Sequence, residues 1–214
     1  MKILLLETSS GKIEFGYAED NNFIVSKQLS KEENADSLIY NIKLEFENAK
    51  LSASDIEVVS LSNGPGSFTG LRIGSAVAKG ICMVNQCKLV EIPTLDIIAN
   101  KYKKDGEVIS AIFSNSKTNE FYYSNYKIEN HKIKRTSDYK IGLIENFYKE
   151  CSTILLNDEK TGNIPAGIDF INLSDKSNLP SQVELTIEYI DKSLFSDFNK
   201  SEPFYMKEFI PVKK

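Results

Sequence analysis

The sequence predicts an α/β protein with two lobes, on the strength of three observations. Short β-branched, apolar segments alternate with longer segments whose apolar residues recur at helical spacing. A glycine-rich loop between residues 62 and 74 joins one expected strand to one expected helix. The pattern is regular up to residue 104 and weaker afterwards, with a hinge-like Lys104–Asp105–Gly106 between. We therefore expect an N-terminal lobe over residues 1–104 and a smaller C-terminal α/β lobe over residues 105–214.

The N-terminal lobe is expected to contain five strands and three helices. The strands are predicted at residues 2–6, 12–19, 23–29, 56–61 and 89–92. The helices are predicted at residues 33–50, 71–84 and 95–103. This order is that of the ribonuclease H-like core shared by actin, sugar kinases and Hsp70 ATPases, in which the first strand ends beside the active site. Glu7 is the acid at that place. The predicted fold is therefore two-lobed and actin-like or Hsp70-ATPase-like (ribonuclease H-like), with mixed sheets flanked by helices.

The C-terminal lobe has weaker patterning. Its strands are predicted at residues 107–113, 119–127, 131–135, 153–156 and 168–173. Its helices are predicted at residues 141–150 and 181–194. The chain closes with the polar and aromatic segment Glu202–Lys207.

The glycine loop is the sharpest local signal. It consists of Asn63, Gly64, Pro65, Gly66, Ser67, Phe68, Thr69 and Gly70. Glycine suits positive φ or a close backbone approach, and proline fixes φ. A helix start favours an anion, but the loop matches neither the P-loop pattern nor G-x-G-x-x-G. An anion site and a rigid turn that packs the helix tightly on a sheet both stay open, and spacing favours the turn.

The helix that follows the loop is apolar on nearly all sides. Only Arg72, Ser75 and Lys79 form a polar stripe, and that stripe is narrow. Such a helix is usually buried on more than one side, so one side is expected to cover the sheet. A second element of the same chain or a partner chain would cover the other side, and the sequence does not choose between them.

Composition limits the classes of function. With 41% hydrophobic residues the chain can form a packed core, and its net charge of −4 argues against gripping nucleic acid alone. Cys82, Cys87 and Cys151 form no C-x-x-C pair, so neither a disulfide framework nor a zinc site is indicated. No apolar run has the length of a signal peptide or a membrane span. We therefore expect a cytoplasmic protein without membrane contacts.

No complete catalytic set or metal site is visible. His131 lies in a lysine-rich hairpin, and no base is apparent near the hydroxyls of Ser67 and Thr69. Glu33 and Asp36 are interpreted as a solvated helix face, and no cluster has the spacing of metal ligands. Interleaved tyrosines and lysines over 122–135 could stack on RNA, but ordinary strand residues are the preferred interpretation. This profile favours a binding or scaffold subunit over an enzyme.

Four segments together resemble one family. Residues 62–81, SNGPGSFTGLRIGSAVAKGI, resemble the glycine signature of the TsaB family, also called YeaZ. The opening strand with its acid, Ile3–Ser9, is similar to that family's first strand. Ile92–Leu95 and Glu202–Lys207 resemble its Pro-(Ser/Thr)-Thr-Leu and C-terminal Pro-x-Tyr-(Leu/Met)-(Arg/Lys) regions. The resemblance spans nearly the whole chain.

The resemblance implies a bacterial cytoplasmic subunit that is not itself an enzyme. It implies a role in making threonylcarbamoyladenosine, next to the anticodon of tRNAs that read codons beginning with A. The partner TsaD would transfer the group, TsaE would join the pair, and ATP and metal would belong to these partners. Contact with tRNA would come only through the complex, and a homodimer is plausible in isolation.

The resemblance also implies where the partner binds. The two helices at 33–50 and 71–84 would pack on a similar pair from TsaD, over an area on the order of 1,500 Å². The partner-binding residues it implies are Leu38, Ile42, Leu71, Arg72, Ser75, Ala76, Ala78, Lys79 and Met83.

Two segments depart from the family pattern. Asn34–Ala35–Asp36 stands where the family often has His-Ser-Glu, and Asn115–Ser116–Lys117–Thr118 stands where it often has Asp-Ala-Arg-Arg. Both changes reduce charge near the expected inter-lobe cleft and leave the helix interface untouched. The alternatives to a scaffold are a glycoprotease-like peptidase and an actin-like nucleotide-binding protein.

Overall fold

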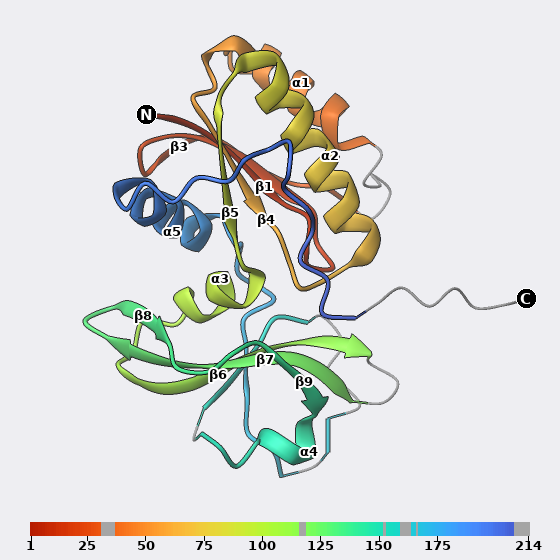
Figure 1. The fold of residues 1–214 in the computed structure, drawn as a ribbon, viewed down its shortest axis with the longest axis vertical. Coiled ribbons are helices and arrows are strands. Elements are labelled where there is room, and N and C mark those ends of the chain that lie inside the picture. Colours follow the sequence, from red (N-terminus) through yellow and green to blue (C-terminus); the bar gives the residue numbers. More distant parts are fainter. Residues whose placement is uncertain (31–36, 116–118, 152, 159–163, 166, 208–214) are drawn as a thin grey trace, which may run out of the picture.

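The molecule consists of two α/β lobes stacked along its long axis (Figure 1). The computed structural model describes residues 1–30, 37–115, 119–151, 153–158, 164–165 and 167–207. In these residues one sheet has the strand order β3-β2-β1-β4-β5, and the other has the order β11-β10-β6-β7-β8 with β9 also paired to β7.

The first sheet has the predicted topology. Its strands are β1 (Lys2–Glu7), β2 (Glu14–Glu19), β3 (Asn22–Gln28), β4 (Val58–Ser62) and β5 (Lys88–Ile92). Strands β1, β2 and β3 are antiparallel neighbours, whereas β4 pairs in parallel with β1 and β5 with β4. Three antiparallel strands followed by two parallel crossovers confirm the predicted ribonuclease H-like, actin-like fold.

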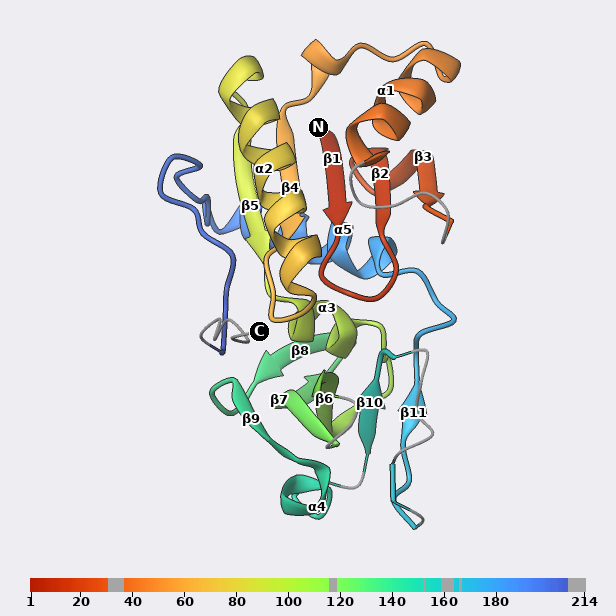
Figure 2. The ribbon, with the colours of Figure 1, turned by 90° about the vertical axis from the view of Figure 1, so that its right-hand side faces the viewer.

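Helices cover both faces of this sheet (Figure 2). Helices α1 (Leu38–Asn48) and α2 (Phe68–Asn85) lie on one face, and α5 (Leu179–Asp191) lies on the other. Leu4 and Leu6 of β1 pack in the core cluster below α1 and α2, whereas Ile3 and Leu5 pack in the cluster with α5. The continuous apolar run of β1 therefore follows from burial on both faces.

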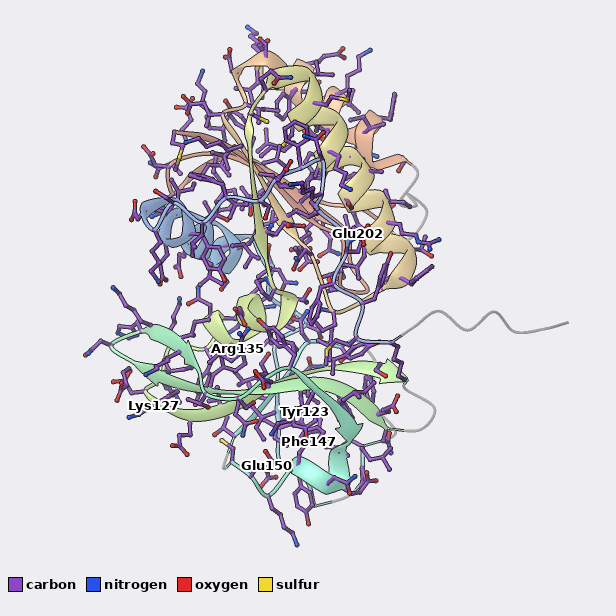
Figure 3. The ribbon with its side chains drawn as sticks, viewed as in Figure 1. Tyr123, Lys127, Arg135, Phe147, Glu150 and Glu202 are labelled. Atoms are coloured by element: carbon purple, nitrogen blue, oxygen red, sulfur yellow. The ribbon has the colours of Figure 1, made fainter. Side chains whose placement is uncertain are left out.

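The second lobe is built on a long hairpin. Its elements are α3 (Thr94–Asn100), β6 (Gly106–Asn115), β7 (Glu120–Glu129), β8 (Lys132–Arg135), β9 (Lys140–Leu143), α4 (Ile144–Phe147), β10 (Ile154–Leu156) and β11 (Ile171–Asn172). Helix α3 packs between the lobes on one face of this sheet, and α4 packs on the other. There the rings of Tyr123 and Phe147 stack with their centroids 3.9 Å apart (Figure 3).

Two expectations for the second half need correction. The helix predicted over 141–150 is wrong, because residues 140–143 form β9 on the edge of β7 and only Ile144–Phe147 is helical. The strand predicted over 168–173 shortens to Ile171–Asn172. In both cases pairing with a strand distant in sequence decides the secondary structure, because a short apolar run is locally compatible with a helix or a strand.

The chain does not stay in the second lobe after residue 105. Helix α5 returns to the first sheet, and Ser196 then pairs with Leu89 beside β5. The segment up to Lys207 runs back along the first lobe towards the second (Figure 1). The division at 104/105 therefore separates the two sheets, while its status as a boundary between folding units stays a prediction.

The glycine loop brings the start of α2 against the end of β1. A Cβ atom at Gly66 would overlap the backbone of Ser9, and one at Gly70 would overlap the carbonyl oxygen of Thr8. The Ser67 N–H donates to the Ser9 carbonyl at 2.8 Å, and the Gly70 N–H donates to the Ser67 side chain at 3.3 Å. These amides are therefore occupied inside the chain. The geometry favours the rigid turn over an anion site.

We predict opposite effects of alanine at two glycines of α2. Gly70→Ala should lower the free energy of unfolding by about 1–3 kcal/mol or more, because the new methyl group meets backbone that cannot move aside. Gly80→Ala should raise it by about 0.5–1 kcal/mol, because a Cβ there meets nothing within 4 Å and alanine favours the helix. Urea unfolding measures both, and an unchanged Gly70→Ala variant would contradict the packing described.

Candidate functional site: an exposed helix face and a closed inter-lobe junction

The outer sides of α1 and α2 expose large apolar side chains. Ile39 and Tyr40 on α1 are 52% and 64% exposed, and Met83 and Val84 on α2 are 68% and 82% exposed. Both helices lie on the same face of the first sheet (Figure 2). We call this surface, together with Ala76, the helix-pair face. Exposed apolar side chains gathered on one face are typical of an interaction surface.

The polar residues around this face are engaged locally. The guanidinium of Arg72 lies 3.9 Å from the ring centre of Phe68, and its Nε donates to the hydroxyl of Tyr205 at 3.3 Å. On α1, Lys43 and Glu47 form an exposed ion pair at 3.7 Å, of a kind that contributes little to stability. The charge at the edge of the face is therefore partly compensated within the chain.

The structure divides the predicted partner-binding residues into two groups. Leu38, Ile42, Leu71, Ser75 and Ala78 are buried, between 0% and 5% exposed, under their own helices. Their side chains pack inside this chain, so they support the helices and do not form the outer surface. Arg72, Ala76 and Met83 are exposed, and Lys79 is half-buried.

Sequence reasoning did not select three residues of the outer surface. Ile39, Tyr40 and Val84 are at least half exposed. Tyr40 and Val84 lie outside the register of the residues that their helices bury, and an apolar residue outside that register is the signal that could have identified them. The departure Asn34–Ala35–Asp36 and residues 116–118 lie outside the described residues.

Glu7 ends β1 at the junction between the lobes and is completely buried. Its Oε1 accepts hydrogen bonds from the Ser9 amide and hydroxyl, both at 2.7 Å, from the Ser10 amide at 3.2 Å and from the Ser62 hydroxyl at 3.0 Å. Its Oε2 accepts from the Asn178 side-chain amide at 2.6 Å. Buried carboxylate oxygens with this many donors are satisfied within the protein. Glu7 stands where the predicted fold would have its active-site acid, and its hydrogen bonds hold the surrounding backbone and side chains in place.

Asn178, the residue before α5, connects the acids of the first sheet to a lysine. Its backbone N–H donates to Glu14 at 2.8 Å, and its side-chain oxygen accepts from Lys101 Nζ at 2.8 Å. The same ammonium donates to Asn157 at 2.8 Å and to the Leu173 carbonyl at 2.7 Å. Burial raises the pKa of Glu14 and lowers the pKa of Lys101 to about 8. Lys101 thus connects the end of α3 to both lobes.

A small cavity of about 230 Å³ opens beside this network. It is lined by Ser10, Gly11, Lys12, Glu14, Phe113, Asn157, Asp158, Ser174, Lys176 and Asn178. Asp158 accepts a hydrogen bond from the Phe113 N–H at 3.0 Å, and burial raises the pKa of its carboxyl to about 6. In the described part of the chain no three His, Cys, Asp or Glu side chains are grouped to hold a metal ion.

The candidate hydrolytic residues do not come together. The Ser67 hydroxyl caps α2, and the His131 ring contacts the Lys103 carbonyl at 2.8 Å in the second lobe. A nucleophile needs a base within hydrogen-bond reach, which this pair does not provide.

Among the helices described, none has the length and apolar character needed to cross a membrane.

The fold and the glycine loop define an actin-like protein of a known class. The family model of TsaD, tRNA N6-adenosine threonylcarbamoyltransferase, matches residues 27–162. Because this match covers more than half of the chain, the chain belongs to that family. Its relatives assign it to the TsaB (YeaZ) proteins within the family.

Two curated relatives carry the same name, tRNA threonylcarbamoyladenosine biosynthesis protein TsaB. The protein of Buchnera aphidicola (subsp. Schizaphis graminum) is 32% identical over 128 residues, 56% of this chain and 60% of that protein. The Escherichia coli K12 protein is 25% identical over 136 residues, 62% of this chain and 58% of that protein. The matches thus span about three fifths of these relatives.

The solved structure of YeaZ from Pseudomonas aeruginosa has the same fold. It superimposes with a TM-score of 0.75 at 15% identity and covers 96% of this chain and 99% of its own. A second structure, of a P. aeruginosa protein with similarity to peptidase YEAZ, gives the same values. These structures confirm the predicted fold class, and the family assignment rests on the family model and the curated relatives.

We predict a pH-dependent stabilisation by Asp158→Asn. The pKa of Asp158 in the folded state lies above its usual 3.8, so its contribution to stability is lost as pH rises through about 6. The amide removes the buried charge but keeps an acceptor for Phe113. The variant should be more stable than the parent by about 1–3 kcal/mol near pH 7, and the difference should vanish near pH 4.

Urea unfolding at the two pH values measures this effect. Asp105→Asn, at an exposed position, is the matched control and should change stability little at either pH. An Asp158→Asn variant that is less stable than the parent at neutral pH would contradict the claim that burial of the charged carboxylate destabilises the folded state.

Proposed function

We propose that this chain is a non-catalytic, cytoplasmic scaffold and activator subunit in threonylcarbamoyladenosine synthesis. Its relatives' names place the family in tRNA threonylcarbamoyladenosine biosynthesis. In the proposal, a TsaD-type transferase docks on the helix-pair face, TsaE joins the pair, and ATP and metal are bound by these partners. The modified residue is the adenosine next to the anticodon in tRNAs that read codons beginning with A, and tRNA is reached only through the complex.

The apolar surface of α1 and α2 is the observation that carries this proposal. Four large apolar side chains, each more than half exposed, lie on two helices of one lobe. A partner that covers them would gain about 25 cal/mol of binding free energy for each Å² of apolar surface removed from water. A similar pair of helices on the transferase would bury them in a four-helix contact, and a second copy of this chain could use the same face when the partner is absent.

The junction between the lobes supports the non-catalytic part of the proposal. Among the residues that the structure describes, the hydrogen bonds that Glu7 accepts all come from neutral groups, and both of its oxygens have donors. A general base or metal ligand needs a lone pair directed at the substrate or the ion. In this chain the donors around Glu7 compete for those lone pairs. The carboxylate instead secures the turn after β1, where α2 is seated.

We predict that charges on the helix-pair face weaken docking. Ala76→Glu and Met83→Glu should each raise the Kd for the transferase of the same organism at least about tenfold, about 1.4 kcal/mol, since they place an unpaired charge in an apolar contact. Both positions are exposed, so both variants should fold normally. Ala78→Glu is unsuitable, because Ala78 is fully buried and the change would disrupt the fold.

Leu194→Glu serves as the matched control. Leu194 is 50% exposed, and its N–H donates to the carbonyl of Tyr189 on α5 at 2.8 Å. Helix α5 covers the opposite face of the first sheet, so the replacement should leave affinity unchanged. Calorimetric titration gives the affinities, and tRNA modification by the transferase with and without this chain gives the activity. Wild-type affinity of both face variants would refute the docking site, and modification that proceeds without this chain would refute the activator role.

A further inference from the structure

The last turn of α2 and the start of β5 bring two thiols together. Cys82 Sγ and Cys87 Sγ lie 3.5 Å apart, Cys82 is completely buried and Cys87 is 8% exposed. Gln86 between them has φ 53° and ends the helix in the left-handed conformation, which turns the chain back so that the two side chains face each other. A disulfide needs the sulfurs about 2.05 Å apart, so they would have to approach by roughly 1.5 Å.

From this geometry we propose that Cys82 and Cys87 form a reversible oxidation site that modulates the helix-pair face. Met83 and Val84, the most exposed of the large apolar side chains on that face, lie between the two cysteines in sequence. Closing the disulfide pulls on the turn that carries them. The effect on docking rests on the proposed function, whereas disulfide formation does not.

The chemistry needs a two-electron oxidant, for which a peroxide is suitable. The Cys87 thiolate attacks one peroxide oxygen, which breaks the O–O bond, gives a sulfenic acid and releases hydroxide that takes up a proton as water. The Cys82 sulfur then attacks the sulfenic sulfur, forms the S–S bond and expels a second water. Two thiols and one hydrogen peroxide thus give one disulfide and two waters.

The environments of the two thiols suit this order of events. Contact with Cys82 lowers the pKa of Cys87, whereas the same contact and burial raise the pKa of Cys82. Cys87 is also the less buried of the two. The third cysteine, Cys151, lies in the second lobe with its Sγ 2.7 Å from the Glu107 carbonyl oxygen, so it offers an internal comparison.

Peroxide treatment followed by thiol counting tests the oxidation site. The denatured protein should fall from three titratable thiols to one, and dithiothreitol should restore all three. Cleavage after Lys79 and Lys88 releases the peptide Gly80–Lys88, which contains both cysteines and should lose two hydrogens. A Cys151→Ala variant should form the same disulfide as the parent, whereas Cys82→Ala and Cys87→Ala should form no disulfide.

Three results would overturn the oxidation site: an unchanged thiol count, a disulfide that includes Cys151, or Cys87 trapped with added oxygen and no loss of the Cys82 thiol. Because the peptide is mapped in the unaltered chain, this test does not depend on the stability of the cysteine variants. Oxygen added to Met83 is recognised separately, because dithiothreitol does not remove it.

Calorimetric titration of the reduced and oxidised forms with the transferase tests the modulation. The oxidised form should bind at least fivefold more weakly, and equal affinity would overturn the modulating role. If neither form binds, the proposed docking function fails, while the thiol count still decides whether the oxidation site exists.

Discussion

The close contact between the start of α2 and the end of β1 is the constraint on which the rest of the first lobe depends. Glycine at 66 and 70 lets the helix approach the backbone of Thr8 and Ser9, where any side chain would collide. The approach fixes which side of α2 covers the sheet, with Leu71, Ala78 and Cys82 inside. The other side is left facing water, and it carries the apolar residues for which we propose a partner.

The same contact connects the helix-pair face to the junction between the lobes. Ser9 accepts the Ser67 N–H with its carbonyl and donates to Glu7 with its amide and hydroxyl. Glu7 in turn is held by Asn178 at the start of α5, which binds Glu14 and Lys101. The acid that would serve chemistry in an actin-like enzyme is thus part of the support for the helix. This arrangement is consistent with a subunit that presents a surface.

Much of the fold followed from sequence because its signals are local. The apolar run of β1, the short strands β2 and β3 and the helical spacing of α1 were each predicted without distant contacts. The segment 140–143 was missed because its state is decided by the edge of β7, which lies far from it in sequence. The network of Asn178 was equally invisible, since its bond to Glu7 joins residues 171 positions apart. Periodicity likewise predicted the two helices, whereas the partner-binding residues that the resemblance implied include Leu38 and Ala78, which are buried under their own helices.

Hydroxyl-radical footprinting of Tyr40 and Met83 tests most directly whether a partner covers the helix-pair face. Both side chains are well exposed in the isolated chain, and Leu143 on β9, at 42% exposure, reports the surface of the second lobe. When the transferase of the same organism is added, oxidation of Tyr40 and Met83 should fall to a small fraction while that of Leu143 stays constant. Undiminished oxidation of both residues in a complex that has formed would show that the partner binds elsewhere.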